Sequence, residues 1–249
     1  MMRNPDGVGE GEARDTPSRR TQGATEMLEQ MRRDVRTVLE RDPAARSAVE
    51  VVLCTPGVHA IWIHRVAHRL WGAGWKLGGR WLSHVGRFLT GIEIHPAAVL
   101  GPGLFIDHGM GIVIGETAEI GENVSILQGV TLGGTSAKRE KRHPTIGDNV
   151  MIGAGAAVLG GFTIGAGSRI GAGSVVVREV PENCVVVGVP GRITFRNGER
   201  VTGGIDLNQT DLPDPLARTL EQMADRIHSL EAEIERLKKM ADATEARTH

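Results

Sequence analysis

A repeat of six residues in the middle of the chain constrains its fold more than any other feature. Aliphatic residues lead successive steps from residue 94 to residue 176, with a shift of two residues after Ile112 and a longer break after Leu132. This period predicts a parallel β-helix, in which each short strand points its leading side chain into a prism. The leading residues are Ile94, Leu100, Ile106, Ile112, Ile114, Ile120, Ile126, Leu132, Ile146, Ile152, Val158, Ile164, Ile170 and Val176.

The residues between the leading positions fit the corners of such a prism. A small or apolar residue stands four positions after most leading residues, as at Ala98, Leu104 and Val124, and a glycine often follows a leading residue directly. Glycine and Asn supply the backbone freedom that a corner needs. The chain has 4 Trp, 4 Phe and no Tyr, which suits a narrow interior with little room for rings.

The rest of the 249-residue chain divides around this repeat. Residues 1–24 are polar and without periodicity, which predicts a disordered tail. Residues 25–91 carry apolar residues at helical spacing, which predicts a small helical domain. We expect the β-helix to occupy residues 92–193, followed by an irregular linker over residues 194–214.

Residues 215–243 carry a heptad pattern and are predicted to form a C-terminal coiled-coil helix. A single helix packed back on the body of the protein is the alternative. The register of the pattern favours two strands. Its a positions are Leu220, Ile227 and Ile234, and its d positions are Met223, Leu230 and Leu237.

The break after Leu132 predicts a loop over residues 133–145. Charge alone fits a solvated loop equally well, but a long loop on a regular solenoid is a usual place for ligand contacts. Its basic residues are Lys138, Arg139, Lys141, Arg142 and His143.

Composition excludes several broad classes of protein. The formal net charge of -1 gives no general attraction to nucleic acid or to an anionic membrane. Cys54 and Cys184 lie far apart in the sequence, which suits a reducing compartment. The N-terminus has no apolar segment typical of an export signal, and no stretch approaches the length of a membrane span. We therefore expect a soluble, cytoplasmic protein.

Asp107 and His108 interrupt the repeat with residues that a purely structural prism does not need. Glu93 precedes His108 by fifteen residues, close to one three-strand turn, so the two residues are expected near one edge on adjacent coils. A carboxylate beside one imidazole nitrogen stabilises the imidazolium and leaves the other nitrogen free to accept a proton. A hydroxyl nucleophile needs such a base. A histidine at this position is otherwise more often structural.

Other motifs give weaker indications. His59, His64 and His68 lie on one predicted helix, and His64 with His68 matches the spacing of a metal-binding pair. No third ligand with suitable spacing accompanies them, so we expect no metal site. The sequence also lacks the glycine-rich phosphate-binding motifs of nucleotide-binding proteins.

The segments IEIHPAA (92–98), DHGMGIVIGET (107–117) and RHPTIGD (142–148) resemble those of the serine O-acetyltransferases of cysteine biosynthesis. The resemblance covers about 150 residues and is far more specific than the six-residue period, which many acyltransferases share. It implies an α+β protein with an N-terminal helical domain followed by a left-handed parallel β-helix. It also implies that three prisms associate, with active sites at the subunit boundaries.

The resemblance assigns roles to the matching residues. His108 matches the base that removes the proton from the serine hydroxyl as it attacks the thioester of acetyl-CoA. Glu93 stands where the family commonly has an Asp that orients the catalytic histidine. The negative charge is therefore kept, on a side chain that is one methylene longer. The serine-binding group is matched by Asp42, Asp107, Arg142 and His143.

The family's acetyl-CoA segments also have counterparts. Acetyl-CoA would act as a co-substrate, and no permanently bound cofactor is implied. The residues expected to line its pantetheine arm are Gly133, Gly134, Gly153, Ala154, Gly155 and Ala172.

The resemblance also bears on partners. It implies L-serine as substrate, L-cysteine as a feedback inhibitor, and a homotrimer, since the helical domain is shorter than in members that pair trimers. The chain ends EARTH rather than in the isoleucine that binds the next enzyme, O-acetylserine sulfhydrylase, so we expect no such complex. Acylation of another small alcohol and a non-catalytic oligomeric scaffold are the alternative functions.

Overall fold

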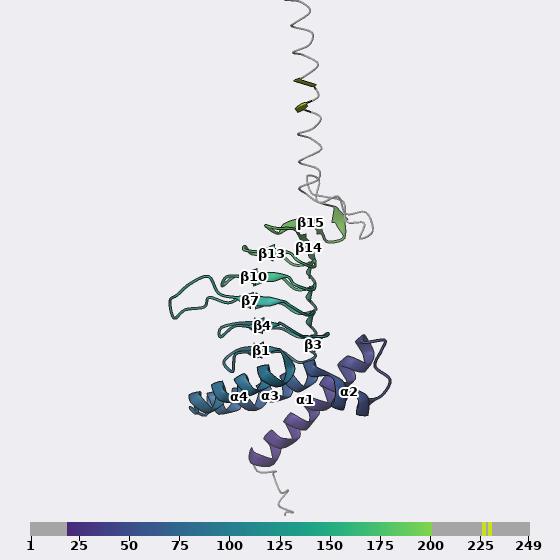
Figure 1. Cartoon of the computed structure of the whole chain (residues 1–249). Helices are drawn as coiled ribbons and strands as arrows, with labels where there is room; N and C mark the ends of the chain where they lie inside the picture. The colour runs from purple at the N-terminus through teal and green to yellow at the C-terminus, as the bar shows by residue number, and fades with distance from the viewer. Residues whose placement is uncertain (1–18, 201–225, 228, 231–249) are drawn as a thin grey trace, which may run out of the picture.

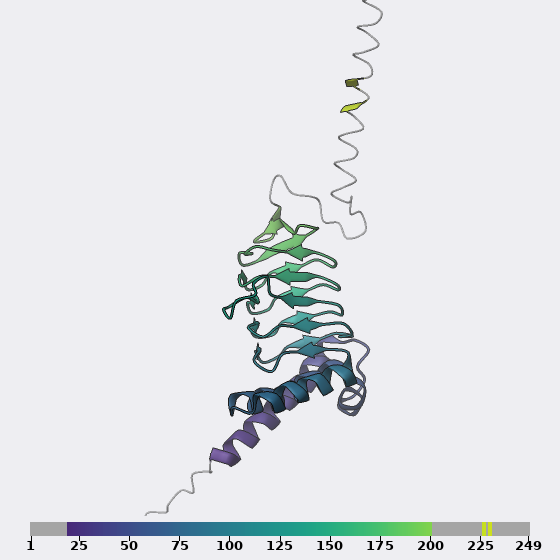
Figure 2. The same ribbon diagram turned by 60° about the vertical axis from the view of Figure 1, so that its left-hand side comes forward.

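Four helices gather at one end of a column of β-coils (Figures 1 and 2). The structure is a computed structural model, and it describes residues 19–200 together with residues 226, 227, 229 and 230. The helices are α1 (Arg19–Arg41), α2 (Ala48–Cys54), α3 (Pro56–Gly72) and α4 (Lys76–Thr90). The predicted helical region is confirmed, and none of the described helices is long and apolar enough to cross a membrane.

Local sequence features set the helix boundaries. α1 begins at Arg19, so its first turns overlap the end of the segment predicted to be a disordered tail. α2 begins after Ser47, whose hydroxyl oxygen accepts a hydrogen bond of 3.2 Å from the backbone N–H of Glu50 and so satisfies a free donor of the first turn. α4 ends at Thr90, and the capping residue Gly91 follows with a φ angle of 71°, which glycine adopts without strain.

Short parallel strands form the three faces of a prism. The first face contains β1, β4, β7, β10 and β13, the second contains β2, β5, β8 and β11, and the third contains β3, β6, β9, β12 and β14. Successive coils are paired in register, so that Ile94 lies opposite Ile114 and Ile120 opposite Ile146. The strands are β1 (Glu93–Ile94), β2 (Val99–Leu100), β3 (Phe105–Ile106), β4 (Val113–Ile114), β5 (Glu119–Ile120), β6 (Ser125–Ile126), β7 (Thr131–Gly133), β8 (Thr145–Ile146), β9 (Met151–Ile152), β10 (Ala157–Leu159), β11 (Thr163–Ile164), β12 (Arg169–Ile170), β13 (Val175–Val176) and β14 (Cys184–Val187).

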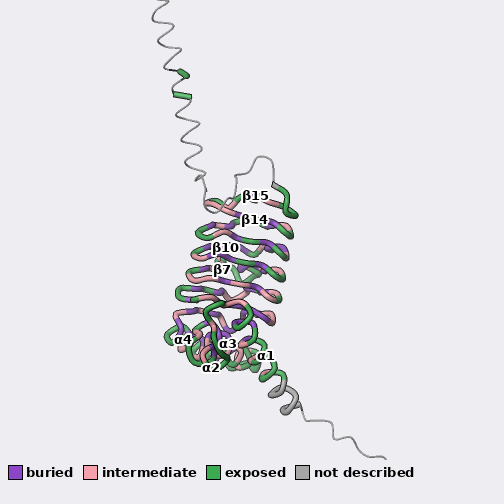
Figure 3. The backbone as a smooth tube through the Cα atoms, turned by 90° about the vertical axis from the view of Figure 1, so that its right-hand side faces the viewer, coloured by how far each residue is buried: buried purple, intermediate pink, exposed green. Residues whose placement is uncertain are grey.

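The leading aliphatic residues fill the interior, as the six-residue period predicts. Every one of them is buried except Leu100, which is half-buried. The small corner residues are buried as well, including Ala98, Ala118 and Val124. Figure 3 shows buried and exposed positions alternating along each coil. The aliphatic column is the main core of the protein, because each coil covers the apolar surface of the next.

Ile112 differs from its predicted role. It does not lead a strand, because β4 is formed by Val113 and Ile114, and Ile112 instead fills the preceding corner, 1% exposed. The shift of two residues in the period is therefore an insertion into this corner. The insertion lengthens the corner that carries Asp107 and His108.

The β-helix ends in a hairpin that sequence analysis missed. β15 (Arg192–Arg196) pairs antiparallel with β14, and β16 (Glu199–Arg200) pairs antiparallel with β15. The prediction of an irregular linker from residue 194 is therefore wrong for residues 194–200. Asn197 and Gly198 have φ angles of 52° and 79°, and an Asn-Gly pair is the sequence most typical of such a tight turn.

The remainder of the predicted linker and most of the predicted coiled coil lie outside the described residues. Within residues 215–243, the structure describes only Arg226, Ile227, Ser229 and Leu230, which are helical. The predicted coiled coil stays a prediction.

The helical region is anchored to the lowest coils. The hydroxyl of Ser83 in α4 donates to the carbonyl oxygen of Ile94 at 2.7 Å. At the end of α1, Nη1 of Arg41 donates to the carbonyl oxygen of Asn123 at 3.2 Å and to Oγ of Ser125 at 3.0 Å. Helix α1 therefore ends against the third face, close to the strand that leads into Asp107.

Candidate active site

Two edges of the prism carry the candidate residues of the β-helix, except Glu93, which lies in β1. We call the corners between the third and first faces the His108 edge; it comprises residues 107–112, 127–130, 153–156 and 171–174. We call the corners between the first and second faces the Arg142 edge; it comprises residues 95–98, 115–118 and 133–144. Backbone hydrogen bonds stack the corners of the His108 edge, from Gly129 to Met110 and from Gly155 to Gln128.

His108 lies at the lengthened corner and points away from the core. Its side chain is 75% exposed, and its φ angle of 57° places it in the left-handed region that non-glycine residues seldom adopt. Nε2 of His108 lies 3.9 Å from Oδ1 of Asp107. The backbone N–H of Asp107 donates to the carbonyl oxygen of Ile126 at 3.0 Å, so the next coil fixes the start of the corner.

Glu93 begins β1, beside the His108 edge. Its backbone N–H donates to the carbonyl oxygen of Ile112 at 2.9 Å. Its carboxylate forms an ion pair with Arg87 of α4, with 2.9 Å between Oε2 and Nη1. Among the described residues, Glu93 makes no hydrogen bond to His108. The two members of the predicted dyad therefore lie near the same edge, but their side chains are not in contact.

Asp42 directly follows α1. One of its carboxylate oxygens accepts a hydrogen bond of 2.8 Å from the backbone N–H of Ala44. The anchoring of Arg41 described above puts Asp42 beside the third face. Among the described residues, no hydrogen bond or ion pair joins Asp42 to Asp107 or His108.

Arg142 and His143 lie on the other edge, at the end of the loop that projects from β7 in Figure 1. Nη2 of Arg142 donates to Oε2 of Glu116 at 2.7 Å. His143 is buried, and its Nδ1 lies 2.9 Å from Oγ1 of Thr117. Burial, followed by the charge of Arg142, lowers the pKa of His143.

The residues predicted to line acetyl-CoA divide between the same two edges. Gly133 and Gly134 belong to the Arg142 edge, whereas residues 153–155 and Ala172 belong to the His108 edge. A Cβ atom at Gly153 would lie 2.6 Å from the backbone nitrogen of Ala172, so glycine is required for this close approach of two coils.

The structure therefore brings the candidate residues together as two sets. Asp107 and His108 share one edge with part of the acetyl-CoA set, with Glu93 beside it in β1, and Arg142 and His143 share the other edge. The two edges bound opposite sides of the first face. The packed aliphatic interior separates them within one copy of the chain.

Two residues of this site were not singled out from the sequence. Glu116 and Thr117 belong to the segment GET (115–117). Glu116 contacts Arg142, and Thr117 contacts both Arg142 and His143, across 25 or 26 positions of sequence. They follow the leading residue Ile114 by two and three positions, and this place in the repeat marked them only as corner residues. The segment carries part of the resemblance to the serine O-acetyltransferases, but that resemblance assigned no role to Glu116 or Thr117.

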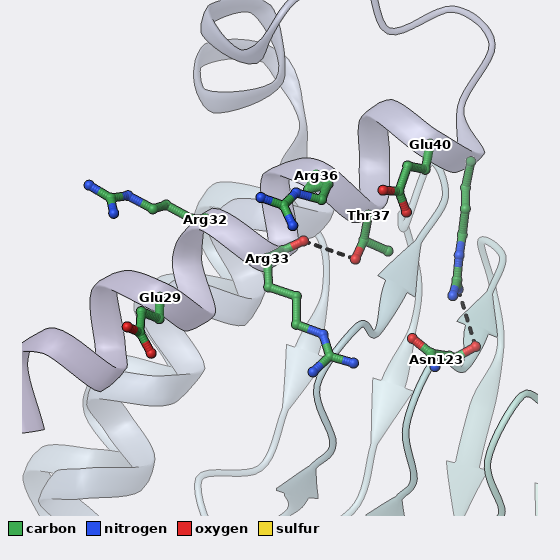
Figure 4. A pocket seen from close by; sticks show the side chains of 8 residues that line it. Glu29, Arg32, Arg33, Arg36, Thr37, Glu40 and Asn123 are labelled. Carbon is green, nitrogen blue, oxygen red and sulfur yellow. Dashed lines mark hydrogen bonds between the residues drawn. The ribbon is translucent and has the colours of Figure 1, made fainter.

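A cleft of about 580 Å³ lies apart from both edges, between α1 and the third face (Figure 4). It contains neither His108 nor Arg142, and its lining is mostly charged. The lining residues are Glu29, Arg32, Arg33, Arg36, Thr37, Glu40, Arg41 and Asn123.

The helical histidines do not converge on a metal site. The rings of His64 and His68 lie 5.5 Å apart, and Nδ1 of His68 lies 2.8 Å from the carbonyl oxygen of Pro96. In the described part of the chain, no group of three or more His, Cys, Asp or Glu residues is arranged to hold a metal ion.

The coils and corners define the class of protein. Residues 143–178 match the family described as bacterial transferase hexapeptide (six repeats). Residues 10–62 match the family described as serine acetyltransferase, N-terminal. The β-helix therefore resembles that of the hexapeptide-repeat transferases. The helical region before it matches the N-terminal region of one group of these enzymes, the serine acetyltransferases.

Comparison with individual proteins narrows the class. A serine acetyltransferase of Bacillus subtilis (strain 168) is 54% identical over 205 residues, which cover 82% of this chain and 94% of the relative. The structure of Neisseria gonorrhoeae serine acetyltransferase in complex with serine is 46% identical, with a TM-score of 0.67 and coverage of 70% and 71%. A serine acetyltransferase solved in complex with cysteine is 42% identical, with a TM-score of 0.67 and coverage of 69% and 71%. This chain belongs to the serine acetyltransferase family.

Proposed function

We propose that the protein is a serine O-acetyltransferase, which transfers the acetyl group of acetyl-CoA to the hydroxyl of L-serine. The products are O-acetyl-L-serine and CoA, in the first step of cysteine biosynthesis from serine. The observation that carries the proposal is His108, an exposed imidazole held at an inserted corner beside a carboxylate. An imidazole in this setting is suited to act as a general base near neutral pH.

The reaction needs one proton acceptor. His108 takes the proton of the serine hydroxyl as the oxygen attacks the carbonyl carbon of the thioester. The C–O bond forms, the C–S bond breaks, and the imidazolium returns the proton to the thiolate of CoA. Glu93 and Asp107 are negative groups close to the same edge, and either stabilises the imidazolium.

The two sets of residues suit the two ends of serine. The carboxylates of Asp42 and Asp107 are complementary to its ammonium group. The guanidinium of Arg142 is complementary to its carboxylate, because its planar donors match carboxylate oxygens in pairs. The ion pair of Arg142 with Glu116 would orient the guanidinium before serine binds.

Assembly of the site requires more than one copy. In a trimer whose first faces surround the three-fold axis, the His108 edge of each copy meets the Arg142 edge of the next. The outward side chains of the first face include Val113, Thr131, Ala157 and Val175, which are small or apolar and suit such a contact. Acetyl-CoA would lie between the same edges, along Gly133, Gly134, residues 153–155 and Ala172.

L-cysteine is proposed as an inhibitor that competes with serine, because it differs from serine only in a thiol for the hydroxyl. One relative has been solved in complex with serine and another in complex with cysteine, which supports binding of both amino acids.

An assay of thiol release from acetyl-CoA tests the function. We expect activity with L-serine, little with other small alcohols, and a loss of at least about 100-fold in kcat for His108→Ala. His84→Ala is the matched control, because His84 is an exposed histidine on α4 outside both edges. Full activity of His108→Ala, or equal activity with other alcohols, would contradict the proposal.

A further inference from the structure

Thr117 uses all of its hydrogen-bonding groups to contact the successive residues Lys141, Arg142 and His143. Its Oγ1 accepts the backbone N–H of Arg142 at 3.1 Å and the backbone N–H of His143 at 3.0 Å. Its carbonyl oxygen accepts a hydrogen bond of 2.6 Å from Nζ of Lys141. One threonine thus binds three successive residues of the loop that returns to the prism.

The same residue determines where the imidazole of His143 carries its proton. The backbone N–H of Thr117 lies 3.1 Å from Nδ1 of His143 and can only donate, so Nδ1 must accept. Because Oγ1 of Thr117 already accepts two N–H groups, its own hydrogen is left to point at Nδ1, 2.9 Å away. A neutral His143 therefore carries its proton on Nε2.

Gly115 leaves room for this ring. A Cβ atom at Gly115 would lie 1.9 Å from Cδ2 and 2.0 Å from Nε2 of His143. Among the described residues, Nε2 makes no hydrogen bond, although His143 is only 8% exposed. The ring is thus held on one nitrogen and presents an unused donor on the other.

We propose that Thr117 is a positioning residue that holds His143 as the neutral Nε2–H tautomer, so that this N–H donates to the bound substrate. The inference rests on the proposed function, together with the place of His143 in the serine-binding group that the family resemblance implies. The charged groups around the ring are Arg142 and Lys141, which oppose protonation, and Glu116, which favours it. His95, on the coil below, is itself held neutral, because burial and then the charge of Arg80 lower its pKa to about 4.

The test compares Thr117→Val, which removes the hydroxyl and keeps the shape, with Thr117→Ser, which keeps the hydroxyl. Imidazole ¹⁵N spectra of the full chain report the tautomer and titration of His143, whose signals are identified by their loss in His143→Asn. We expect the Nε2–H form in the wild type and in Thr117→Ser. In Thr117→Val, the titration midpoint of His143 should rise, and the protonated form should appear at a higher pH.

Kinetics test the use of the tautomer. Loss of one well-placed hydrogen bond should raise the KM for serine roughly tenfold in Thr117→Val, with the KM for acetyl-CoA unchanged and with recovery in Thr117→Ser. An unchanged titration of His143 in Thr117→Val, or an equal defect in Thr117→Ser, overturns the proposal. An altered titration with an unchanged KM for serine overturns the donor role. Absence of serine acetylation by the wild type would refute the proposed function, and the spectra would still decide whether Thr117 sets the tautomer.

Discussion

Asp34 of α1 and Arg65 of α3 form a buried ion pair that joins the two helices. The Asp34 side chain is 2% exposed, and Nη2 of Arg65 donates to its Oδ1 at 2.8 Å, with a second contact from Nη1 to Oδ2. Nε1 of Trp62 also donates to Oδ2 of Asp34, at 3.0 Å. The carboxylate is thus satisfied on both oxygens although it is buried.

Removal of one partner of this pair is expected to be costly. Arg65→Met should lower the free energy of unfolding by about 3 kcal/mol, because it leaves the Asp34 carboxylate buried with only the Trp62 donor. The double variant Asp34→Leu, Arg65→Met should recover most of that loss. Denaturant unfolding of the three proteins measures both effects, and a single variant as stable as the wild type would show that the pair is not needed.

Gly115→Ala should impair serine binding without unfolding the protein. The added methyl group occupies the place of the His143 ring, so the ring must move. We expect the KM for serine to rise at least about tenfold. Gly72→Ala is the matched control, because a Cβ atom there meets nothing within 4 Å. Equal kinetics of the two variants would argue against a tightly held ring.

Substitutions of Glu93 test its role in orienting His108. Glu93→Gln keeps the shape and removes the charge, so it should lower kcat about tenfold or more if the carboxylate stabilises the imidazolium. Glu93→Asp keeps the charge and should retain more activity than Glu93→Gln. Wild-type kcat in Glu93→Gln would leave Asp107 as the stabilising carboxylate.

Mixing two inactive variants tests whether the site is shared between copies. His108→Ala and Arg142→Ala each damage one edge. If the two edges of a site come from neighbouring copies, random co-assembly from an equal mixture should restore roughly a quarter of the sites. Each variant assembled alone is the control. No recovery in verified mixed assemblies would mean that both edges of a site belong to one copy.

His64 should make the stability depend on pH. Burial, and then the neighbouring His68, lower its pKa from 6.5 to about 3, and the backbone groups of Ala98 and His95 oppose this shift only weakly. Neither ring nitrogen makes a hydrogen bond of good geometry among the described residues. Below pH 6.5, His64 binds a proton in the unfolded chain but stays neutral in the folded protein. The free energy of unfolding therefore falls as the pH decreases toward about 3, by up to about 1.4 kcal/mol per pH unit.

The variant His64→Leu isolates this contribution. Its free energy of unfolding should fall less steeply than that of the wild type as the pH decreases from 6.5. At higher pH it should be at least as stable, because two buried nitrogens without partners are removed. Denaturant unfolding at a series of pH values measures the difference. Parallel curves for the two proteins would contradict the prediction.

The comparison of sequence with structure is most informative at the two ends of the β-helix. At the lower end, Ile112 fits the six-residue period but fills a corner, since a period does not reveal where an insertion falls. At the upper end, the pair Asn197 and Gly198 is typical of a tight hairpin turn, so the hairpin of β15 and β16 could have been predicted from the sequence. The buried hydroxyl of Thr194, which donates to the carbonyl oxygen of Val185 at 3.2 Å, shows how the last coil is covered.

The sequence by itself determined the prism, because each face repeats the same short strand and the inward aliphatic residue therefore recurs every six residues along the chain. It also marked His108 and Arg142 through short motifs. Only the tertiary structure decided that these residues occupy different edges, that Thr117 and Gly115 hold His143, and that Asp34 pairs with Arg65. Such contacts join residues separated by between 26 and 31 positions or by a whole face of the prism. They depend on how coils and helices stack in space, which no local pattern of residues encodes.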